Sequence, residues 1–278
     1  HMPELIIGAR GHDFGRHTPE ELLTSIGKAG FRCTQLAYTK AIEGVKSYAD
    51  ITPELVEATK AAVAASGVSI AVDGTYVELS YADEDKRRAE VAKVLSQIPV
   101  AKALGAGCMG SETTNMAKQP GVTRKEAQEA LLRSLGEILP LCEEQGVLFA
   151  VECVYYHAMN TPEAVKMVLD TMASPNLRVI CDFANYVGPE NASVDAQRRI
   201  WDKVRRQDRR RPLQGPELPA RRHPLLHLAG RFLRGLCGRL CHAQGDAANG
   251  PSRSARRSRP RPRGQRYCVH PPLLHLIF

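Results

Sequence analysis

The sequence predicts an α/β protein built on a parallel sheet, with the architecture of a (β/α)8 barrel whose last two β/α units cannot be recognised. Short apolar segments alternate with amphipathic segments through six strand-then-helix steps. Strict alternation of strand and helix is typical of a parallel sheet. No GxGxxG segment follows the first apolar run, so the sequence gives no support to an open dinucleotide-binding sheet and favours a barrel.

The strands are expected where short runs rich in β-branched residues end at polar residues or glycine. The six runs are Leu5–Ile7, Cys33–Leu36, Val68–Val72, Gly107–Gly110, Val147–Val151 and Leu177–Cys181. Apolar residues in consecutive positions predict strands that are covered on both faces, as in the interior of an α/β fold.

The helices are expected to begin at N-cap residues. Thr-Pro-Glu opens three of them, at Thr18, Thr52 and Thr161, and Thr123 forms a capping box with Glu126. A long helix is predicted for Asp83–Leu104, in which Pro99 marks a potential break. A further helix is predicted over residues 191–204.

Two carboxylates stand at the ends of neighbouring strands. Glu152 follows Val147–Val151, and Asp182 follows Leu177–Cys181. Because a βαβ unit makes its strands parallel, both side chains are expected at the same edge of the sheet, where they can share a divalent cation. Either residue could instead be a helix cap or a solvated loop residue, but their apolar and aromatic flanks favour metal binding.

Polar residues also follow the other strands. Sites in (β/α)8 barrels lie at the C-terminal ends of the strands, so we expect one rim to carry His12, Gln35, Asp73, Glu112, Glu152 and Asp182. Among these, His12 and Glu112 are candidates for the pocket wall. His12 could equally be a loop residue, and Glu112 could cap the turn that follows it.

The composition changes abruptly after residue 204. Residues 1–204 carry 11 lysines, 10 arginines and 27 acids, a formal charge of −6, whereas residues 205–278 carry 17 arginines, no lysine and three acids, a charge of +14. A basic tail could bind nucleic acid. A composition rich in arginine, proline and glycine and without lysine is also expected when a GC-rich gene is translated in the wrong reading frame. We prefer this second interpretation for residues 205–278, because natural basic tails usually mix lysine with arginine.

Residues 4–203 resemble the sugar phosphate isomerase/epimerase family of xylose-isomerase-like TIM barrels. The resemblance rests on VLFAVECV with Glu152, on the segment from His157 through Thr161-Pro162-Glu163, and on LRVICDFAN with Asp182. It implies that Glu152 and Asp182 are two of four ligands to a divalent metal, commonly Mn, Mg or Co. The other two, a histidine and a glutamate of the last strands, cannot be assigned. A one-base shift near Val204 permits a His-x-Lys-Asp motif, the kind that carries the histidine, because the shifted codon at Pro212 allows a histidine.

The resemblance implies a metal-dependent sugar or sugar phosphate isomerase or epimerase that transfers a proton beside a carbonyl through a metal-stabilised enediolate. Glu152 would be ligand and acid/base, and Asp182 a ligand only. His157, Asn185, Glu112 and His12 would contact the substrate, with His157 alternatively orienting a ligand or packing in its loop. Asn185 stands where ketose epimerases of this family tend to carry a histidine, which leaves other sugar-acting relatives open.

Two alternatives compete with this enzyme. The protein could instead bind nucleic acid, either through the arginine-rich tail or as an endonuclease IV-like metal nuclease. Such a nuclease needs several histidine ligands, and residues 1–203 contain few histidines. Nucleic acid is therefore not the expected partner. A barrel that lacks two ligands could instead be non-catalytic. We expect a soluble cytoplasmic protein without a membrane span, with buried thiols rather than disulfides. Open strand edges in an incomplete barrel would favour a homo-oligomer.

Overall fold

The computed structural model describes residues 8–182, 185–186, 188, 192–196, 198–199 and 276–277. All of them belong to one compact unit, formed by residues 1–225 and 273–278, whereas the second unit, 226–272, lies outside the described residues. The predicted strand at Leu5–Ile7, most of the helix predicted over 191–204 and almost all of the tail 205–278 also lie outside them. Our interpretation of the tail therefore stays a prediction.

The sheet confirms the predicted alternation of parallel strands and helices. Six parallel strands follow one another in chain order: β1 (Gly8–Arg10), β2 (Cys33–Leu36), β3 (Ser69–Gly74), β4 (Cys108–Glu112), β5 (Phe149–Glu152) and β6 (Leu177–Cys181). A two-residue strand, β7 (Leu276–Ile277), pairs antiparallel with β6. This parallel run with alternating helices is the arrangement of a TIM barrel.

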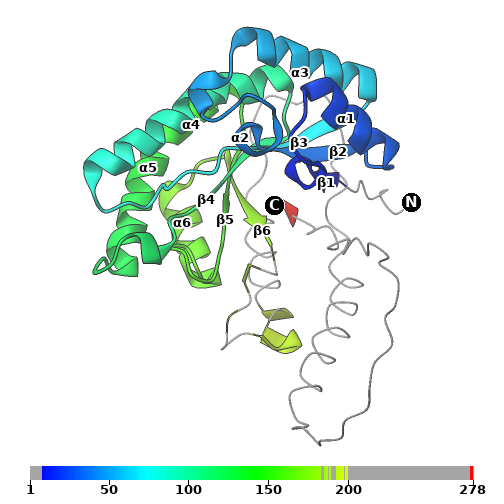
Figure 1. The fold of residues 1–278 in the computed structure, drawn as a ribbon. Coiled ribbons are helices and arrows are strands. Elements are labelled where there is room, and N and C mark those ends of the chain that lie inside the picture. The colour runs from blue at the N-terminus through cyan, green and yellow to red at the C-terminus, as the bar shows by residue number, and fades with distance from the viewer. Residues whose placement is uncertain are drawn as a thin grey trace, which may run out of the picture. The chain divides into compact units, whose positions relative to one another are not determined.

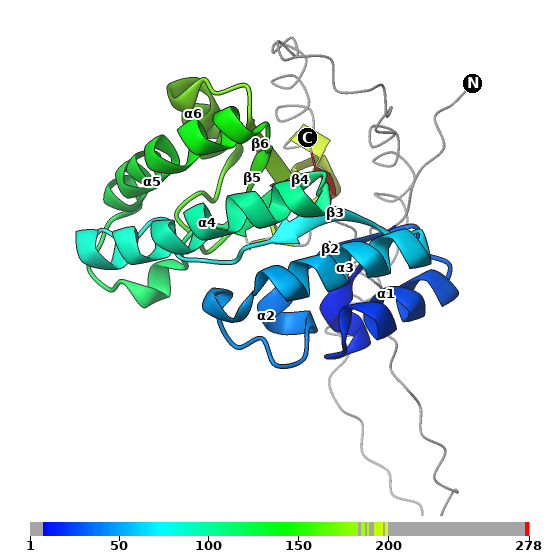
Figure 2. The same ribbon diagram turned by 90° about the horizontal axis from the view of Figure 1, so that it is seen from above.

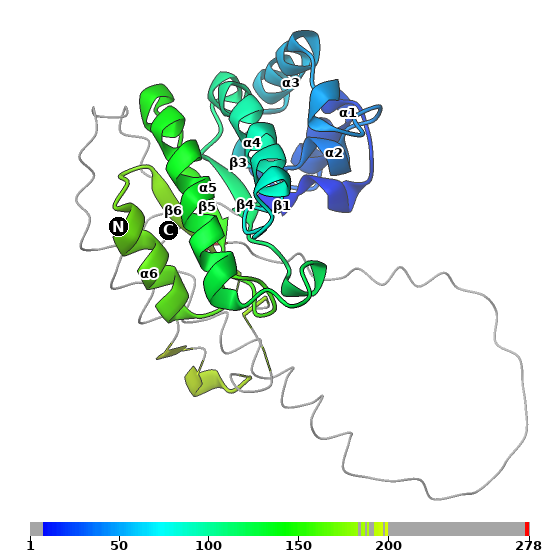
Figure 3. The ribbon, with the colours of Figure 1, turned by 90° about the vertical axis from the view of Figure 1, so that its left-hand side faces the viewer.

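The helices cover one side of the sheet, as Figure 1, Figure 2 and Figure 3 show, and the longer ones pack against one another. They are α1 (Pro19–Lys28), α2 (Tyr38–Ala41), α3 (Pro53–Ser66), α4 (Glu84–Leu104), α5 (Arg124–Gln145) and α6 (Pro162–Met172). Short 3-10 helices η1 (Gly11–Phe14), η2 (Tyr48–Asp50) and η3 (Met116–Lys118) lie in the loops. Within the described residues, no helix has the length and apolar character that a membrane crossing requires.

The predicted helix caps are confirmed. The hydroxyls of Thr18, Thr52, Thr123 and Thr161 each accept a hydrogen bond from the backbone N–H three residues later. The potential break at Pro99 is not realised, since α4 continues through it to Leu104. Buried side chains on both sides of Pro99, such as Ile98 and Ala101, hold α4 against the core and offset the lost hydrogen bond.

The two faces of the sheet carry different side chains. Met109, Phe149, Val151 and Val179 pack with the helices in the large core. The opposite face carries a small cluster of Val72, Cys108, Ala150 and Ile180. Gly110 lies on this second face, where a Cβ would be 2.7 Å from Val72 Cγ1 and 2.8 Å from Ile180 Cδ1. Side chains from β3 and β6 thus meet over β4, as in the interior of a barrel.

Arg87 joins α4 to α5. Its side chain is 1% exposed and donates hydrogen bonds to Glu84 of its own helix and to Ser134 and Glu137 of α5. We expect Arg87→Met to lower the free energy of unfolding by about 2–3 kcal/mol, because a buried network loses its centre while both glutamates stay hydrated. The matched control is Arg88→Met, whose exposed side chain also pairs with Glu84 and should cost less than about 1 kcal/mol. Equal losses for both variants in urea unfolding would contradict this account.

Candidate active site

Glu152 is the last residue of β5, and its side chain is 1% exposed. Because Ala150 precedes it by two residues and faces the barrel interior, Glu152 points to the same side. Its Oε1 accepts a 2.7 Å hydrogen bond from Asn185 Nδ2. The pKa of Glu152 is raised to about 8, mainly by burial; the hydrogen bond from Asn185 opposes the increase, the charges of Glu112 and Asp182 add to it, and Lys40 opposes it.

Asp182 directly follows β6 and is 2% exposed. It lies two residues after Ile180, which places it on the interior side as well. Its Oδ1 accepts a 3.3 Å hydrogen bond from the backbone N–H of Asn185. The structure therefore brings together both carboxylates that the sequence predicts as metal ligands.

Asn185 holds these two carboxylates in one arrangement. Its backbone donates to Asp182, its side-chain amide donates to Glu152, and its carbonyl accepts a 2.8 Å hydrogen bond from Tyr155 N. Asn185 was predicted as a substrate contact, but its amide already binds Glu152. Within the described contacts it positions the carboxylates.

Glu112 ends β4 and is the ladder partner of Glu152. Its side chain is 37% exposed, far more than that of Glu152. Partial burial raises the pKa of Glu112, with Glu78 and Asp182 adding to the increase and Lys40 and Lys118 opposing it. Glu112 therefore stands on the same wall as Glu152 but closer to solvent, and its assignment to a pocket wall stays a prediction.

His157 lies in the loop after β5, which an isolated bridge joins to Asn115 in the loop after β4. The residue is 4% exposed, and its Nε2 lies 3.9 Å from Glu112 Oε2. The pKa of His157 is lowered to about 4, mainly by burial and also by the charge of Lys118, against the opposing effect of a hydrogen bond with the backbone of Thr113. The imidazole is therefore neutral at physiological pH and can donate or accept a hydrogen bond beside the carboxylates.

His12 lies in η1, directly after β1, and is partly buried. Its strand is at the opposite end of the parallel run from β6. His12 is thus at the C-terminal end of its strand, as predicted, but its assignment as a substrate contact stays a prediction.

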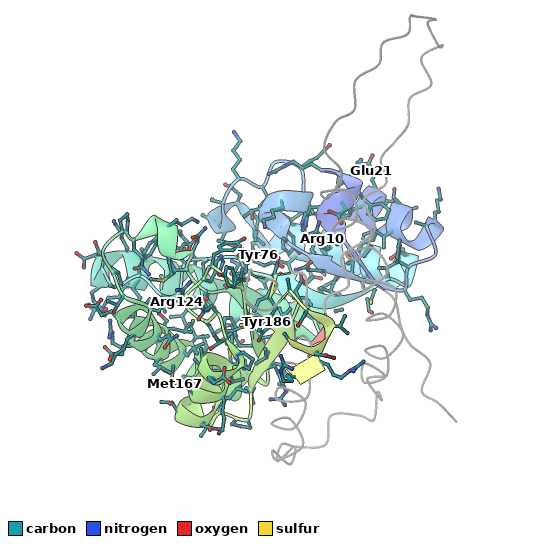
Figure 4. The ribbon with its side chains drawn as sticks, turned by 90° about the horizontal axis from the view of Figure 1, so that it is seen from below. Arg10, Glu21, Tyr76, Arg124, Met167 and Tyr186 are labelled. Atoms are coloured by element: carbon teal, nitrogen blue, oxygen red, sulfur yellow. The ribbon has the colours of Figure 1, made fainter. Side chains whose placement is uncertain are left out.

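Two residues that the sequence did not single out lie close to the acids. Lys40 of α2 places its Nζ 4.2 Å from the ring centroid of Tyr76, in the loop after β3. Burial raises the pKa of Tyr76, and the charges of Glu152 and Glu112 raise it further, so the phenol lies near both carboxylates. Figure 4 shows Tyr76 over the middle of the sheet, whereas Glu21 and Met167 lie on the outer helices. The sequence signal for Tyr76 is its place two residues after the end of β3.

Asp73 does not join the other acids, contrary to the rim that the sequence predicts. Its ladder partner on β4 is Met109, which packs among the helices. Asp73 therefore faces the helix side, where its charge acts on Tyr38 and Tyr48. The reason is that β3 extends to Gly74, so Asp73 lies inside the strand on the outer face rather than beyond its end.

Glu152 and Asp182 fit half of a divalent metal site. Two buried carboxylates that lie close together are stabilised by a bound cation, and the charge of Asp182 contributes to the raised pKa of Glu152. Magnesium is commonly held by only one or two protein carboxylates and keeps several water molecules. Among residues 8–182 and the other described positions, no group of three or more His, Cys, Asp or Glu side chains is arranged to hold a metal ion.

Comparison with known proteins decides the family. A family model described as xylose isomerase-like TIM barrel matches residues 23–229. The chain belongs to the xylose isomerase-like TIM barrel family. The resemblance predicted from the segments around Glu152 and Asp182 is thereby confirmed. No curated protein matches the sequence.

Solved structures with the fold of this family include several sugar-acting enzymes. The 3-keto-D-glucoside 4-epimerase YcjR from E. coli is 14% identical, with a TM-score of 0.58 over 72% of this chain and 77% of that chain. A D-psicose 3-epimerase with D-tagatose, from Clostridium cellulolyticum H10, is 16% identical, with a TM-score of 0.57 over 71% and 70%. A xylose isomerase-like TIM barrel protein from Mycobacterium smegmatis in complex with magnesium is 15% identical, with a TM-score of 0.56 over 73% and 71%. At these identities the likeness shows the fold alone.

Proposed function

We propose that this family member is a divalent-metal-dependent isomerase or epimerase of a sugar or sugar phosphate. The observation that carries the proposal is the pair of buried carboxylates, Glu152 and Asp182, which Asn185 joins on the interior side of neighbouring strands. Similar structures named as sugar epimerases, one of them with D-tagatose, support the substrate class. A similar structure in complex with magnesium supports a divalent cation, for which Mn, Mg and Co are the candidates.

The residues of the chain take distinct roles in this proposal. Glu152 and Asp182 hold the cation, which when bound polarises the carbonyl and hydroxyl oxygens of the sugar. Glu152 also accepts the proton from the carbon beside the carbonyl and returns it. Without the cation, burial raises the pKa of Glu152 to about 8; a bound cation would lower this pKa and leave the carboxylate ionised and able to accept a proton. Asn185 orients Glu152, and His157, Glu112 and His12 bind substrate hydroxyls.

Removal of metal tests the proposal. The full chain is treated with EDTA, dialysed and incubated in D2O with D-tagatose or D-fructose, and hydrogen exchange beside the carbonyl is followed by NMR. We expect exchange and product only after Mn²⁺, Mg²⁺ or Co²⁺ is returned, with a loss of at least about 100-fold in its absence. Turnover that survives metal removal would contradict the metal-dependent mechanism.

A further inference from the structure

Gln35 of β2 is a buried polar residue to which the site described above gives no role. Its ladder partner on β3 is Val72, a member of the cluster on the barrel interior, and its neighbour Leu36 packs among the helices. Ladder partners project to the same face of a sheet and consecutive residues to opposite faces, so the Gln35 side chain points into the interior. It stands one residue before the C-terminal end of its strand, toward the rim that carries Glu152.

The amide of Gln35 is available to a ligand. The residue is 6% exposed, and neither its Nε2 nor its Oε1 makes a hydrogen bond with any described residue. Buried polar side chains are nearly always hydrogen-bonded, and an unpaired one destabilises the fold. Gln119 shows the usual arrangement: it is 9% exposed, and its Nε2 donates to Ser80 O at 3.0 Å while its Oε1 accepts from Ala82 N at 3.1 Å.

An apolar contact across the interior separates Gln35 from Glu152. Val72 is the ladder partner of Gln35, and Ile180 is that of Glu152. Val72 Cγ1 and Ile180 Cδ1 lie 2.7 and 2.8 Å from the position that a Cβ on Gly110 would occupy, so these side chains meet over β4. Gln35 and Glu152 therefore flank this apolar contact, where one bound molecule can reach both.

Tyr76 bounds the same side of the interior. A Cβ on Gly74, two residues after Val72, would lie 2.7 Å from Tyr76 Cε2, so the ring covers β3 just above the level of Gln35. The ring is partly buried and offers an apolar surface to the carbon skeleton of a sugar. A polar group and an aromatic ring thus stand together on neighbouring strands.

A carboxamide selects hydroxyl groups. It has two N–H donors and a carbonyl acceptor, so its full pairing needs a ligand that both accepts and donates hydrogen bonds, as neighbouring sugar hydroxyls do. A phosphate ester at neutral pH carries close to two negative charges and mainly accepts, which would leave Gln35 Oε1 unpaired. Arg10, the ladder partner of Gln35 on β1, already donates two hydrogen bonds to Asp13, at 3.1 and 2.9 Å.

We propose that Gln35 is a specificity-determining residue, which binds neighbouring hydroxyl groups at the end of the substrate remote from Glu152 and Asp182. The substrate is therefore a free sugar or a similar neutral polyol, and not a sugar phosphate. Tyr76 bounds this subsite. The inference rests on the proposed function and narrows its substrate class.

Calorimetric titration of the full chain with Mg²⁺ present tests this subsite. D-fructose and D-tagatose are the neutral probes, and D-fructose 6-phosphate is the charged probe. We expect at least one neutral sugar to bind at least about tenfold more tightly than the phosphate ester. The affinity for that sugar should fall at least about tenfold in Gln35→Met, which keeps the length of the side chain and removes the amide.

Thermal unfolding without sugar separates binding from a structural role. Gln35→Met should unfold at the temperature of wild type or higher, because an unpaired buried amide is replaced by an apolar side chain of similar size. The matched control is Gln119→Met, whose amide is paired within the protein. This variant should unfold at a lower temperature and keep the sugar affinity of wild type within about twofold.

Four results would overturn the inference. Gln35→Met with the sugar affinity of wild type would show that the amide does not contact the sugar. A lower unfolding temperature in Gln35→Met, as in Gln119→Met, would show that the amide is paired within the protein. Binding of D-fructose 6-phosphate as tightly as the free sugars would contradict the substrate class, and absence of binding of both free sugars would contradict the subsite.

The proposed function fails on a different observation, which is turnover that survives metal removal. Loss of sugar affinity in Gln35→Met together with such metal-independent turnover would support the subsite and contradict the metal-dependent mechanism. Metal-dependent turnover together with unchanged sugar affinity in Gln35→Met would overturn the subsite alone.

Discussion

Glu152→Gln is expected to lower the rate of carbon-bound proton exchange by about 10³-fold or more, to near the background rate. Glutamine keeps the volume of the side chain and can still accept the hydrogen bond from Asn185. It cannot take up a proton from carbon, and it removes one of the two charges that hold the cation. The loss should appear in kcat and in the apparent affinity for metal.

The same variant should be at least as stable as wild type, because a carboxylate that is 1% exposed is replaced by a neutral side chain. Thermal unfolding without metal measures this. Glu144→Gln on α5, which is exposed, is the matched control and should leave exchange unchanged. Exchange by Glu152→Gln within about threefold of wild type would refute the assignment of Glu152 as the base.

Asp73→Asn is expected to stabilise the protein by about 2–4 kcal/mol at pH 8. Asp73 is 2% exposed, its Oδ2 makes no hydrogen bond with the described residues, and burial raises its pKa to about 7. The unfolded chain binds this proton only below about pH 4. The folded state therefore binds more protons between pH 4 and 7, and its stability falls as the pH rises through this window and levels off above the folded pKa.

Urea unfolding of wild type and Asp73→Asn at pH 8 and pH 5 measures this effect. The advantage of the variant should be largest at pH 8 and should shrink by more than half at pH 5, because each pKa unit corresponds to about 1.4 kcal/mol. Asp170→Asn, whose side chain is 59% exposed on α6, should change stability by less than about 0.5 kcal/mol at either pH. A pH-independent difference for Asp73→Asn would show that the carboxyl is not the cause.

Local signals predicted the fold well. The threonine caps and the apolar runs are short-range features, and the apolar runs placed five of the six strands to within two residues at each end. The first run, Leu5–Ile7, precedes β1, which begins at Gly8. The prediction that Pro99 could break the helix was wrong, because tertiary packing holds α4 together. Local sequence patterns contain no information on such packing.

The site could be predicted only where strand direction and side-chain alternation agree. Glu152 and Asp182 each lie two residues after an interior side chain, so both predictions of position were met. The face to which Asp73 points depends on the length of β3 and on the irregular pairing of β2 with β3 between Thr34 and Gln35. The sequence reveals neither feature. The contact of Lys40 with Tyr76 joins α2 to the loop after β3 and depends on the whole fold.

The most direct measurement of the central claim is a calorimetric titration of the metal-free full chain with Mn²⁺. We expect one ion to bind per chain, with the affinity at least about tenfold lower in both Glu152→Gln and Asp182→Asn, because each removes one of two carboxylate ligands. Equal affinity in wild type and both variants, or no binding by wild type, would contradict a metal centre at Glu152 and Asp182.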